Sequence, residues 1–532
     1  MQENIGESAE EEMGQGIKAP GELFAVCAKK IKKEWKLAFF SAVVIGLLVH
    51  MPALLSDIPN HDGLDSLYFD QNMITSGRWF LMAACGMSSF YTIPWVIGLI
   101  GLLWLGITAA VLVELLEVKQ SWAVVTISGL LTSFPALAST FAYVFTLDGY
   151  MLALLLAALS VLLTKKYRYG FLAGGVCLAF SLGIYQGYLA FAMILCVLAI
   201  LMLFADGGRV GEKLRKMLRY VYMGILGAVL YYVILQILLR LEGKELASYQ
   251  GISGMAGGVP DSGILGTIRE MYSDFFHFSL GGNVLFNNGI SASACILLAV
   301  AALGTGIFLM LRRKWWKNPL FFAIIVLAVV MLPLITNVIL LISPSVTYHL
   351  LMRYQWVLYL IAMTAFVSRY GGELPVGKLA EWLAFAAAFV IVFCYGVSDN
   401  IGYSNLQKKY EKTYAYCVRL LDRIEQTEGY YQGIPIAMVG VVGNEEFPAT
   451  DLTLPVTSGM IGLNGDMLLY TGENYRLFIR NYLGATLNIL PADAMSDMYY
   501  EEEYISMDSF PGENSIRIID GIMYIKTENV NR

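Results

Sequence analysis

The chain alternates between long apolar runs and short polar connections along most of its length. Apolar runs recur from Leu37 onward, and a run of about 18 residues with few charges is long enough to cross a bilayer as a helix. The pattern predicts roughly eleven crossings. Their bounds are 37–55, 93–116, 121–138, 149–164, 171–185, 188–205, 219–239, 290–311, 319–342, 350–368 and 380–398.

The polar connections are of two kinds, and they alternate. Lysine and arginine gather around 119, 165–168, 209–216, 312–317 and 369–378, and in KKIKKEWK before the first run. Because basic loops remain in the cytoplasm, residues 1–36 are expected there. The opposite connections, including the long loops 56–92 and 240–289, then face outward. An odd number of crossings places the C-terminal end outside as well.

The composition supports an integral membrane protein. Of 532 residues, 57% are hydrophobic and 15% are charged, whereas soluble domains carry about 25% charged residues. The sequence has no basic patch of the kind that binds nucleic acid, so that class is excluded. Most of the seven cysteines fall inside apolar runs without CxxC spacing, and no disulfide is expected. The four histidines are scattered, so we predict no metal site and no cofactor, although a divalent metal stays open.

The pattern changes near Asp399. The stretch NLQKKYEKTYAYCVRLLDRIEQ predicts an amphipathic helix with Tyr410, Tyr414, Val418, Leu421 and Ile424 on its apolar side. GIPIAMVGVVGN predicts a buried strand, and Asp520-Gly521 marks a hairpin turn near the end. The fold class is therefore mainly α. A helix bundle over 37–399 precedes a small α/β domain over 400–532.

A second unusual segment lies in the loop 240–289. This loop is too long for a simple connector. Its stretch ILGTIREMYSDFFHF, residues 264–278, is apolar with scattered charges and predicts a helix lying along the membrane surface.

The first outer loop concentrates the residues suited to chemistry. Asp62 and Asp65 are three apart and share one face if the segment is helical. One carboxylate of such a pair can act as a general base, although acids that merely solvate a loop give the same pattern. Arg78, before two aromatic residues, suits a phosphate or ordinary headgroup anchoring. Arg353 starts a crossing on the outer side, where arginine is not expected, and is a second candidate for binding phosphate.

Five further residues lie at the same face. Asp148 opens a crossing, where it either contacts a sugar or stabilises the helix dipole. Tyr185 and Gln186 occupy a tight outer turn and either hydrogen-bond a sugar or pack the turn. His61 and His349 lie beside Asp62 and Arg353 as accessory residues.

Four motifs in this order resemble a known family. They are NHDGLD…SGRW (60–79), FTLDGYMLAL (145–154), GIYQ (183–186) and the arginine at 353. The arrangement resembles the GT-C glycosyltransferases and, more narrowly, the bacterial glucosyltransferase-II family that modifies O-antigen and related surface glycans. The likeness spans the membrane portion and the helix that follows it. Family members often carry adjacent acids in the first loop, whereas Gly63 and Leu64 separate the pair here.

The resemblance implies an inverting glycosyltransferase of the bacterial cytoplasmic membrane. It would move a hexose, glucose by analogy, from a polyprenyl-phosphate donor to a cell-surface glycan on the outer face. The base would be Asp62, with Asp65 as the second candidate, and Arg353 and Arg78 would stabilise the leaving phosphate. The alternatives are a transporter or flippase of lipid-linked glycans, a glycan polymerase or ligase without a carboxylate base, and a non-catalytic scaffold.

Overall fold

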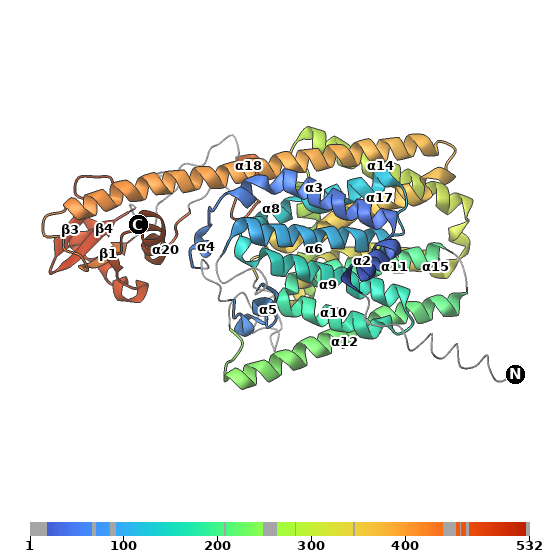
Figure 1. Cartoon of the computed structure of the whole chain (residues 1–532), viewed down its shortest axis with the longest axis horizontal. Coiled ribbons are helices and arrows are strands. Elements are labelled where there is room, and N and C mark those ends of the chain that lie inside the picture. The colour runs from blue at the N-terminus through green and yellow to red at the C-terminus, as the bar shows by residue number, and fades with distance from the viewer. Residues whose placement is uncertain are drawn as a thin grey trace.

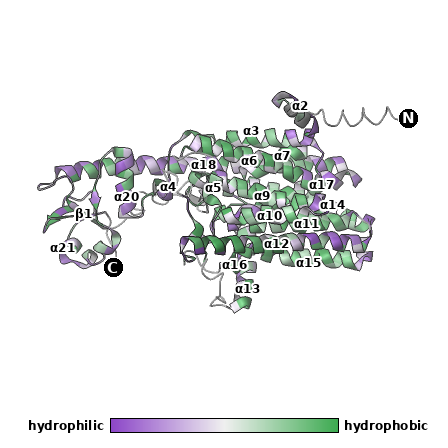
Figure 2. Ribbon diagram, turned by 60° about the horizontal axis from the view of Figure 1, so that its bottom comes forward, coloured by the Kyte–Doolittle hydropathy of each residue, from purple (hydrophilic) through white to green (hydrophobic). Residues whose placement is uncertain are grey.

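The computed structural model describes residues 19–65, 71–85, 92–206, 209–247, 263–281, 284–343, 346–439, 454–457, 459–463 and 468–527. A bundle of long helices forms one body, and a small sheet unit lies beyond one end of it (Figure 1). The bundle is apolar over most of its length (Figure 2). The structure thus confirms a mainly helical polytopic bundle.

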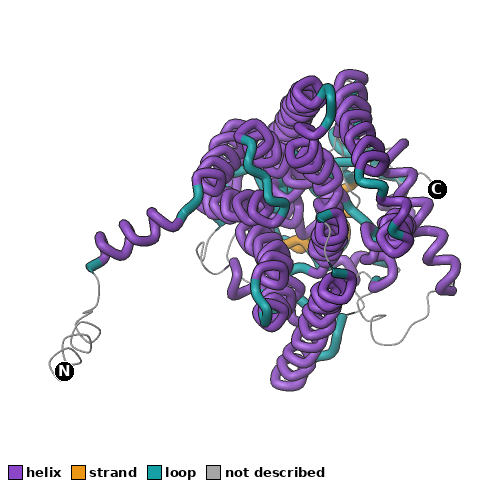
Figure 3. Tube along the Cα trace, turned by 90° about the vertical axis from the view of Figure 1, so that its right-hand side faces the viewer, coloured by secondary structure: helices purple, strands orange, loops and turns teal. Residues whose placement is uncertain are grey.

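Within the described ranges, nine helices are long and apolar enough to cross a membrane. They span Lys33–Leu55, Pro94–Leu115, Val144–Lys166, Gln186–Ala205, Val210–Glu242, Gly289–Arg312, Pro319–Thr336, Leu350–Glu373 and Gly377–Gln426. Viewed from the end carrying the N-terminal segment, they pack side by side (Figure 3). The protein is therefore a multi-pass membrane protein.

The helices and strands have the following bounds. The bundle consists of α3 (Lys33–Leu55), α6 (Pro94–Leu115), α7 (Ser121–Ser133), α8 (Pro135–Phe141), α9 (Leu147–Lys166), α10 (Gly170–Ile184), α11 (Leu189–Ala205), α12 (Val210–Glu242), α14 (Gly289–Arg312), α15 (Pro319–Thr336), α16 (Val338–Ile342), α17 (Val357–Tyr370) and α18 (Gly377–Gln426). Short elements around it are α2 (Pro20–Lys30), α4 (His61–Asp65), η1 (Ile74–Ser76), α5 (Leu81–Cys85), η2 (Val144–Thr146), η3 (Gln186–Tyr188), α13 (Gly263–Phe276), η5 (His277–Gly281), η6 (Trp315–Lys317), η7 (Leu350–Trp356) and η8 (Gly371–Glu373). The C-terminal unit contains β1 (Pro435–Val439), α19 (Leu454–Thr457), α20 (Gly472–Phe478), η9 (Ile479–Leu483), β2 (Asn488–Ile489), η10 (Ala492–Met495), η11 (Met498–Tyr500), α21 (Glu502–Ile505), β3 (Ile516–Ile519) and β4 (Ile522–Lys526).

Two of the eleven predicted crossings differ from simple spans. The run at 171–185 is α10, an apolar helix of 15 residues. The run at 121–138 is the pair α7 and α8, bent by 46° at a short break. Pro135 has no N–H, so the carbonyl of Leu131 loses its helical partner and accepts from the Tyr354 hydroxyl instead. The neighbouring Thr132 carbonyl accepts from Nε2 of His50 at 2.7 Å. Buried side chains thus supply hydrogen bonds to the carbonyls beside the break.

Ion pairs gather at the bundle end opposite the sheet unit. Glu114 pairs with Lys32 at 2.7 Å and with Lys166 at 3.0 Å. Glu117 pairs with Arg369 at 2.8 Å. The basic partners Lys32, Lys166 and Arg369 belong to connections expected in the cytoplasm, so the structure brings these basic segments to one end.

Helix α18 joins the bundle to the C-terminal unit without a break. It contains 50 residues and is therefore roughly 75 Å long. The last predicted crossing and the predicted amphipathic helix are consecutive parts of this one element (Figure 1). Its buried side differs from the predicted one, because Tyr414 and Val418 are exposed. Cys417 and Leu420 are buried in their place.

The C-terminal unit is a four-stranded sheet in the order β2-β1-β4-β3. Strand β1 runs parallel to β2 and to β4, whereas β3 and β4 form an antiparallel hairpin. Asp520 and Gly521 form its turn with φ of 50° and 82°, as a two-residue hairpin turn of the primed type requires. The predicted hairpin is confirmed, and so is the predicted strand over Pro435–Val439; residues 440–444 of that prediction lie outside the described residues.

Candidate active site

The segment before Arg78 forms a tight turn clamped by two distant side chains. Nε2 of Gln186 donates to the carbonyl of Ser76 at 3.2 Å and to the hydroxyl of Tyr231 at 3.0 Å. That hydroxyl donates in turn to the carbonyl of Gly77 at 3.1 Å. Gly77 has a φ of +74°, and a Cβ there would lie 2.6 Å from the Tyr231 hydroxyl. Only glycine fits this turn, which fixes the direction in which Arg78 leaves the backbone.

Arg78 lies on a layer of tyrosines from α9 and the α10–η3 turn. Its Nη1 donates to the hydroxyl of Tyr150 at 3.2 Å, and its guanidinium carbon lies 5.0 Å from the centre of the Tyr185 ring. The two rings are stacked with centroids 4.3 Å apart. The Tyr185 side chain is buried, and a phenol is neutral at pH 7. The layer thus presents a cation held by neutral aromatic groups.

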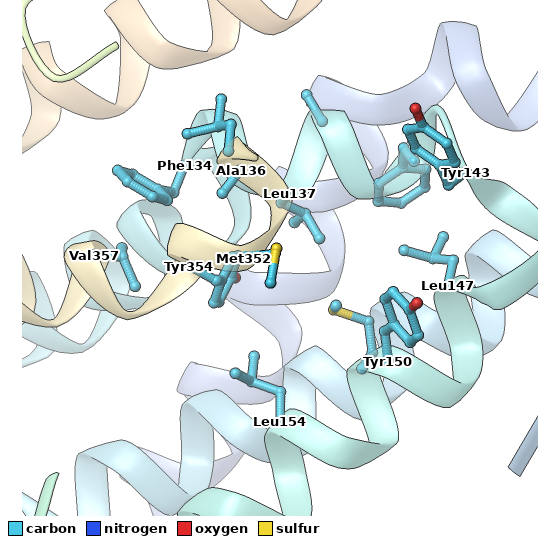
Figure 4. Close-up of a cluster of buried hydrophobic side chains, with 14 of the residues drawn as sticks. Phe134, Ala136, Leu137, Tyr143, Leu147, Tyr150, Leu154, Met352, Tyr354 and Val357 are labelled. Carbon is cyan, nitrogen blue, oxygen red and sulfur yellow. The ribbon is translucent and has the colours of Figure 1, made fainter. Parts of the chain in front are cut away.

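Tyr150 also borders the buried cluster where α8, α9 and η7 meet. Figure 4 shows Tyr150 and Leu147 on α9, with Met352 and Tyr354 on η7 at the other side of the cluster. The packing joins the Arg78 layer to the segment that carries Arg353.

Arg353 is buried and bound by a carboxylate that the sequence analysis did not single out. Nη1 and Nη2 donate to the two carboxylate oxygens of Asp274 at 2.6 and 2.7 Å. The guanidinium carbon lies 3.7 Å from the centre of the Tyr348 ring and 4.7 Å from that of Phe278. Asp274 belongs to α13, the helix predicted in loop 240–289. A bidentate pair at this position holds α13 against η7.

His349 precedes η7 and is half-buried. Burial, and then the charge of Arg353, lower the pKa of its imidazole. The side chain is therefore neutral at pH 7, which avoids a second cation beside Arg353.

Ring contacts connect the two arginine segments. Arg78 lies over the Tyr185 ring and Arg353 over the Tyr348 ring. The Tyr188 ring packs against Tyr185 and against Tyr354, the residue after Arg353. Aromatic packing thus links the segments that carry the two guanidinium groups. Each group lies over a tyrosine ring of its own, and Gln186 lies behind the Arg78 turn.

Asp62 lies in the short helix α4, between the bundle and the C-terminal unit. Its Oδ1 is 3.3 Å from Nε2 of His61, and its side chain is 55% exposed. The His61 ring packs edge-on against Tyr470, with centroids 4.5 Å apart, and also faces Tyr143. Asp65 is the last residue of α4, but its side chain lies outside the described part of the structure. The geometry therefore gives Asp62 a water-accessible position and a histidine neighbour.

Asp148 occupies the first turn of α9 and is fully buried. One carboxylate oxygen accepts from the backbone N–H of Gly149 at 2.9 Å. The thiol of Cys85, on α5, contacts the same carboxylate, and burial followed by this charge raises the pKa of the thiol. A Cβ on Gly149 would lie 2.6 Å from the sulfur. Asp148 thus faces the packed outer loop, an arrangement that favours a role in positioning that loop.

No group of three or more His, Cys, Asp or Glu side chains that could hold a metal occurs in the described ranges.

The match to a family model decides the classification. The model for glucosyl transferase GtrII matches residues 51–368, more than half of the chain. The chain belongs to the GtrII glucosyl transferase family. The GtrII match takes in Arg78, Arg353 and the tyrosines between them, and it supports a glycosyltransferase activity. It ends before α18, so the helix after the membrane portion, which the motif resemblance had included, lies beyond it. Comparison with curated proteins gave no match, and comparison with solved structures gave none either.

Proposed function

We propose that this glucosyltransferase moves a hexose, glucose by family, from a polyprenyl-phosphate donor to a cell-surface glycan. The reaction takes place on the outer face of the bacterial cytoplasmic membrane. The observation that carries the proposal is the presence of two guanidinium groups, Arg78 and Arg353, each held over a tyrosine ring in segments linked by aromatic packing. Two fixed cations beside aromatic rings suit a phosphate at the end of an apolar chain.

The donor phosphate gains charge as the reaction proceeds. The acceptor hydroxyl oxygen attacks the anomeric carbon while the bond from that carbon to the phosphate oxygen breaks. The phosphodiester, with one negative charge, leaves as a phosphomonoester that carries up to two. Preorganised cations stabilise this developing charge more than they stabilise the bound donor. Arg78 and Arg353 have this role, and inversion at the anomeric carbon follows from a single displacement.

The acceptor proton needs a base. Asp62 is our first candidate, and Asp65 in the same short helix is the second. Water-accessible Asp62 can receive the proton directly, and His61 at 3.3 Å orients its carboxylate. His349 serves as an accessory residue near the phosphate. Tyr185 forms the floor beneath the sugar, and Gln186 and Asp148 act on the outer loop through the contacts described above.

The orientation follows from the distribution of charge. The basic connections at the end opposite the sheet unit are assigned to the cytoplasm. The tyrosine layer, α4 and residues 400–532 then face outward, where a lipid-linked donor and a surface glycan can meet. No metal or other cofactor is required by this scheme.

A carrier of lipid-linked glycans and a polymerase or ligase remain the rival functions. A carrier needs no carboxylate base, so it would tolerate Asp→Asn changes at the outer surface. The family match favours a transferase over both.

The test is donor turnover by the purified full-length chain in nanodiscs, with polyprenyl-phosphate-glucose and a crude surface-glycan acceptor. Asp62→Asn and Asp65→Asn are compared with wild type, and Glu245→Gln, an exposed acid elsewhere in the outer loops, is the matched control. Loss of turnover in one aspartate variant with donor binding retained identifies the base. Turnover that persists in both variants removes the base from α4, and no turnover by wild type contradicts the donor assignment.

A further inference from the structure

A cleft with mostly apolar walls and a few polar groups opens beside α4, and neither Arg78 nor Arg353 lines it. Its volume is about 280 Å³, and it is lined by the segment 56–59, the α8–η2 corner and the middle of α18. Phe141 and Tyr403 form apolar walls, while Asp57, Asn400 and Gln407 contribute polar groups. We call it the Asp57 cleft. Its size is just below the lower end of typical ligand pockets, which suits one sugar unit of a longer chain.

The charge of the lining excludes a phosphate. Asp57 is the sole ionised group among the residues that line the cleft, and neither lysine, arginine nor histidine contributes to it. Within the described part of the chain, this carboxylate has no hydrogen bond and no ion pair. The Asp57 side chain is exposed to solvent, and partial desolvation raises its pKa. An accessible carboxylate of this kind is suited to accepting hydrogen bonds from neighbouring hydroxyl groups of a neutral sugar.

The walls of the cleft are held in place from behind. The hydroxyl of Tyr403 lies 2.6 Å from Nδ1 of His50, whose ring stacks on Phe141 with centroids 4.2 Å apart. Nε2 of His50 faces the Thr132 carbonyl, which can only accept, so this nitrogen carries the proton. The Tyr403 hydroxyl therefore donates to Nδ1, which fixes its orientation and that of the aromatic wall.

An aromatic surface continues from the cleft along α18. Tyr410 lies close enough to Asp57 for the carboxylate to affect its phenol. Its ring lies 6.2 Å from that of Tyr414 and 5.4 Å from that of Tyr482 on the C-terminal unit, and Tyr414 is 40% exposed. Aromatic faces beside a polar cleft can pack against the apolar faces of sugar rings. They form a path leading outward from the cleft.

We propose that the Asp57 cleft binds one neutral sugar residue of the acceptor glycan, whose chain continues over Tyr410 and Tyr414. This inference rests on the proposed function and names where its acceptor lies. Gly63, next to Asp62, lines the same cleft. A sugar held there thus lies alongside the helix that carries the candidate base, while the phosphate-bearing donor occupies the arginine pair.

The experiment measures glycan binding without donor, so that it is independent of catalysis. Saturation-transfer NMR on nanodisc-embedded protein uses maltotriose, a rhamnose trisaccharide and an N-acetylglucosamine trisaccharide as neutral probes, with trigalacturonic acid as the acidic comparison. Ser404→Trp fills the cleft from an exposed lining position. Lys408→Trp places the same ring at an exposed position of α18 that does not line the cleft, and is the matched control.

We expect wild type to bind at least one neutral trisaccharide better than trigalacturonic acid. Ser404→Trp should weaken that binding at least tenfold, and Asp57→Asn about tenfold, the effect of losing hydrogen bonds to a charged acceptor. Lys408→Trp should bind as wild type does. Binding unchanged in Ser404→Trp, a preference for the acidic probe, or no neutral binding by wild type would each overturn the proposal. Donor binding measured on the same samples reports separately on the arginine pair.

Discussion

Arg353 and Asp274 form a two-hydrogen-bond ion pair between segments 79 residues apart in the sequence. Arg353 is buried, and the Asp274 side chain is 24% exposed. The pair joins an amphipathic helix, whose Ile264 and Leu265 are exposed, to the first turn of a membrane span. The same guanidinium is our candidate for binding the donor phosphate, so carboxylate and phosphate compete for one cation.

That competition leads to a prediction for Asp274→Asn. The neutral amide should bind Arg353 less strongly, so the KM for the donor should fall about three- to tenfold, equivalent to about 1 kcal/mol. The apparent Tm should also fall, because a buried cation loses its partner. Steady-state turnover and thermal unfolding in nanodiscs measure both effects. Glu270→Gln, which changes an exposed acid one turn earlier on α13, is the control. An equal change of KM in both variants would show that the loss of a negative charge, and not the loss of the Arg353 pair, causes the effect.

Gly77→Ala should impair turnover through the position of Arg78. The new methyl group would meet the Tyr231 hydroxyl and Nε2 of Gln186, and the turn that aims the guanidinium must shift. We expect kcat/KM to fall at least tenfold, since small displacements of a catalytic group have large effects. Gly243→Ala also has a positive φ, of +64°, but has open space around it. The positive φ alone should lower the stability of both variants by about 1 kcal/mol, and Gly77→Ala should lose more because of its clash. Similar turnover in the two would contradict this account.

Tyr150→Phe removes one hydroxyl that accepts from Nη1 of Arg78 and leaves the stacked ring in place. We expect kcat/KM for the donor to fall about three- to tenfold, the usual effect of about 1 kcal/mol. Tyr232→Phe, at an exposed position on α12, should leave turnover unchanged. Donor-dependent kinetics at several ionic strengths provide the measurement. Unaltered kinetics in Tyr150→Phe would show that this bond does not position Arg78.

The lowered pKa of His349 predicts a pH dependence of stability. The folded imidazole binds its proton less readily than the unfolded one, whose pKa is about 6.5. The unfolded state therefore gains protons first as the pH falls through 6.5, and stability decreases below that value. His349→Gln should remove this part of the decrease. Unfolding temperatures of both proteins between pH 7.5 and 5 test the prediction, and parallel profiles would refute it.

The sequence pattern predicted the bundle well because a membrane helix needs a long uninterrupted apolar run, which is easy to recognise in a sequence. Arg353 was singled out because an arginine at an outer helix start departs from the normal sorting of charge, and Arg78 because it precedes two interface aromatic residues. Asp274 was missed. It lies among scattered charges of a surface helix, and nothing local indicates that its carboxylate meets Arg353 from a segment far along the chain.

Two details depend on features that hydropathy does not record. The run 121–138 has the hydropathy of one crossing, but hydropathy does not register which carbonyls lose their partners at Pro135. The apolar side predicted for the second half of α18 differs from the side that is buried, because its tyrosines are amphipathic. Tyr414 can lie at a surface, whereas Tyr416 on the other side of the helix is buried. Periodicity alone cannot rank residues that have both an apolar ring and a hydroxyl.

Helix α18 also sets a distance. About 20 of its residues suffice to cross the bilayer. The remaining part of the helix is roughly 45 Å long and holds the sheet unit at that distance from the membrane. Tyr403 and Gln407 line the cleft from this part of the helix, and its last turns lead to the sheet unit (Figure 1). Because a continuous helix is stiff, a force on the sheet unit would tilt or rotate the same helix where it lines the Asp57 cleft.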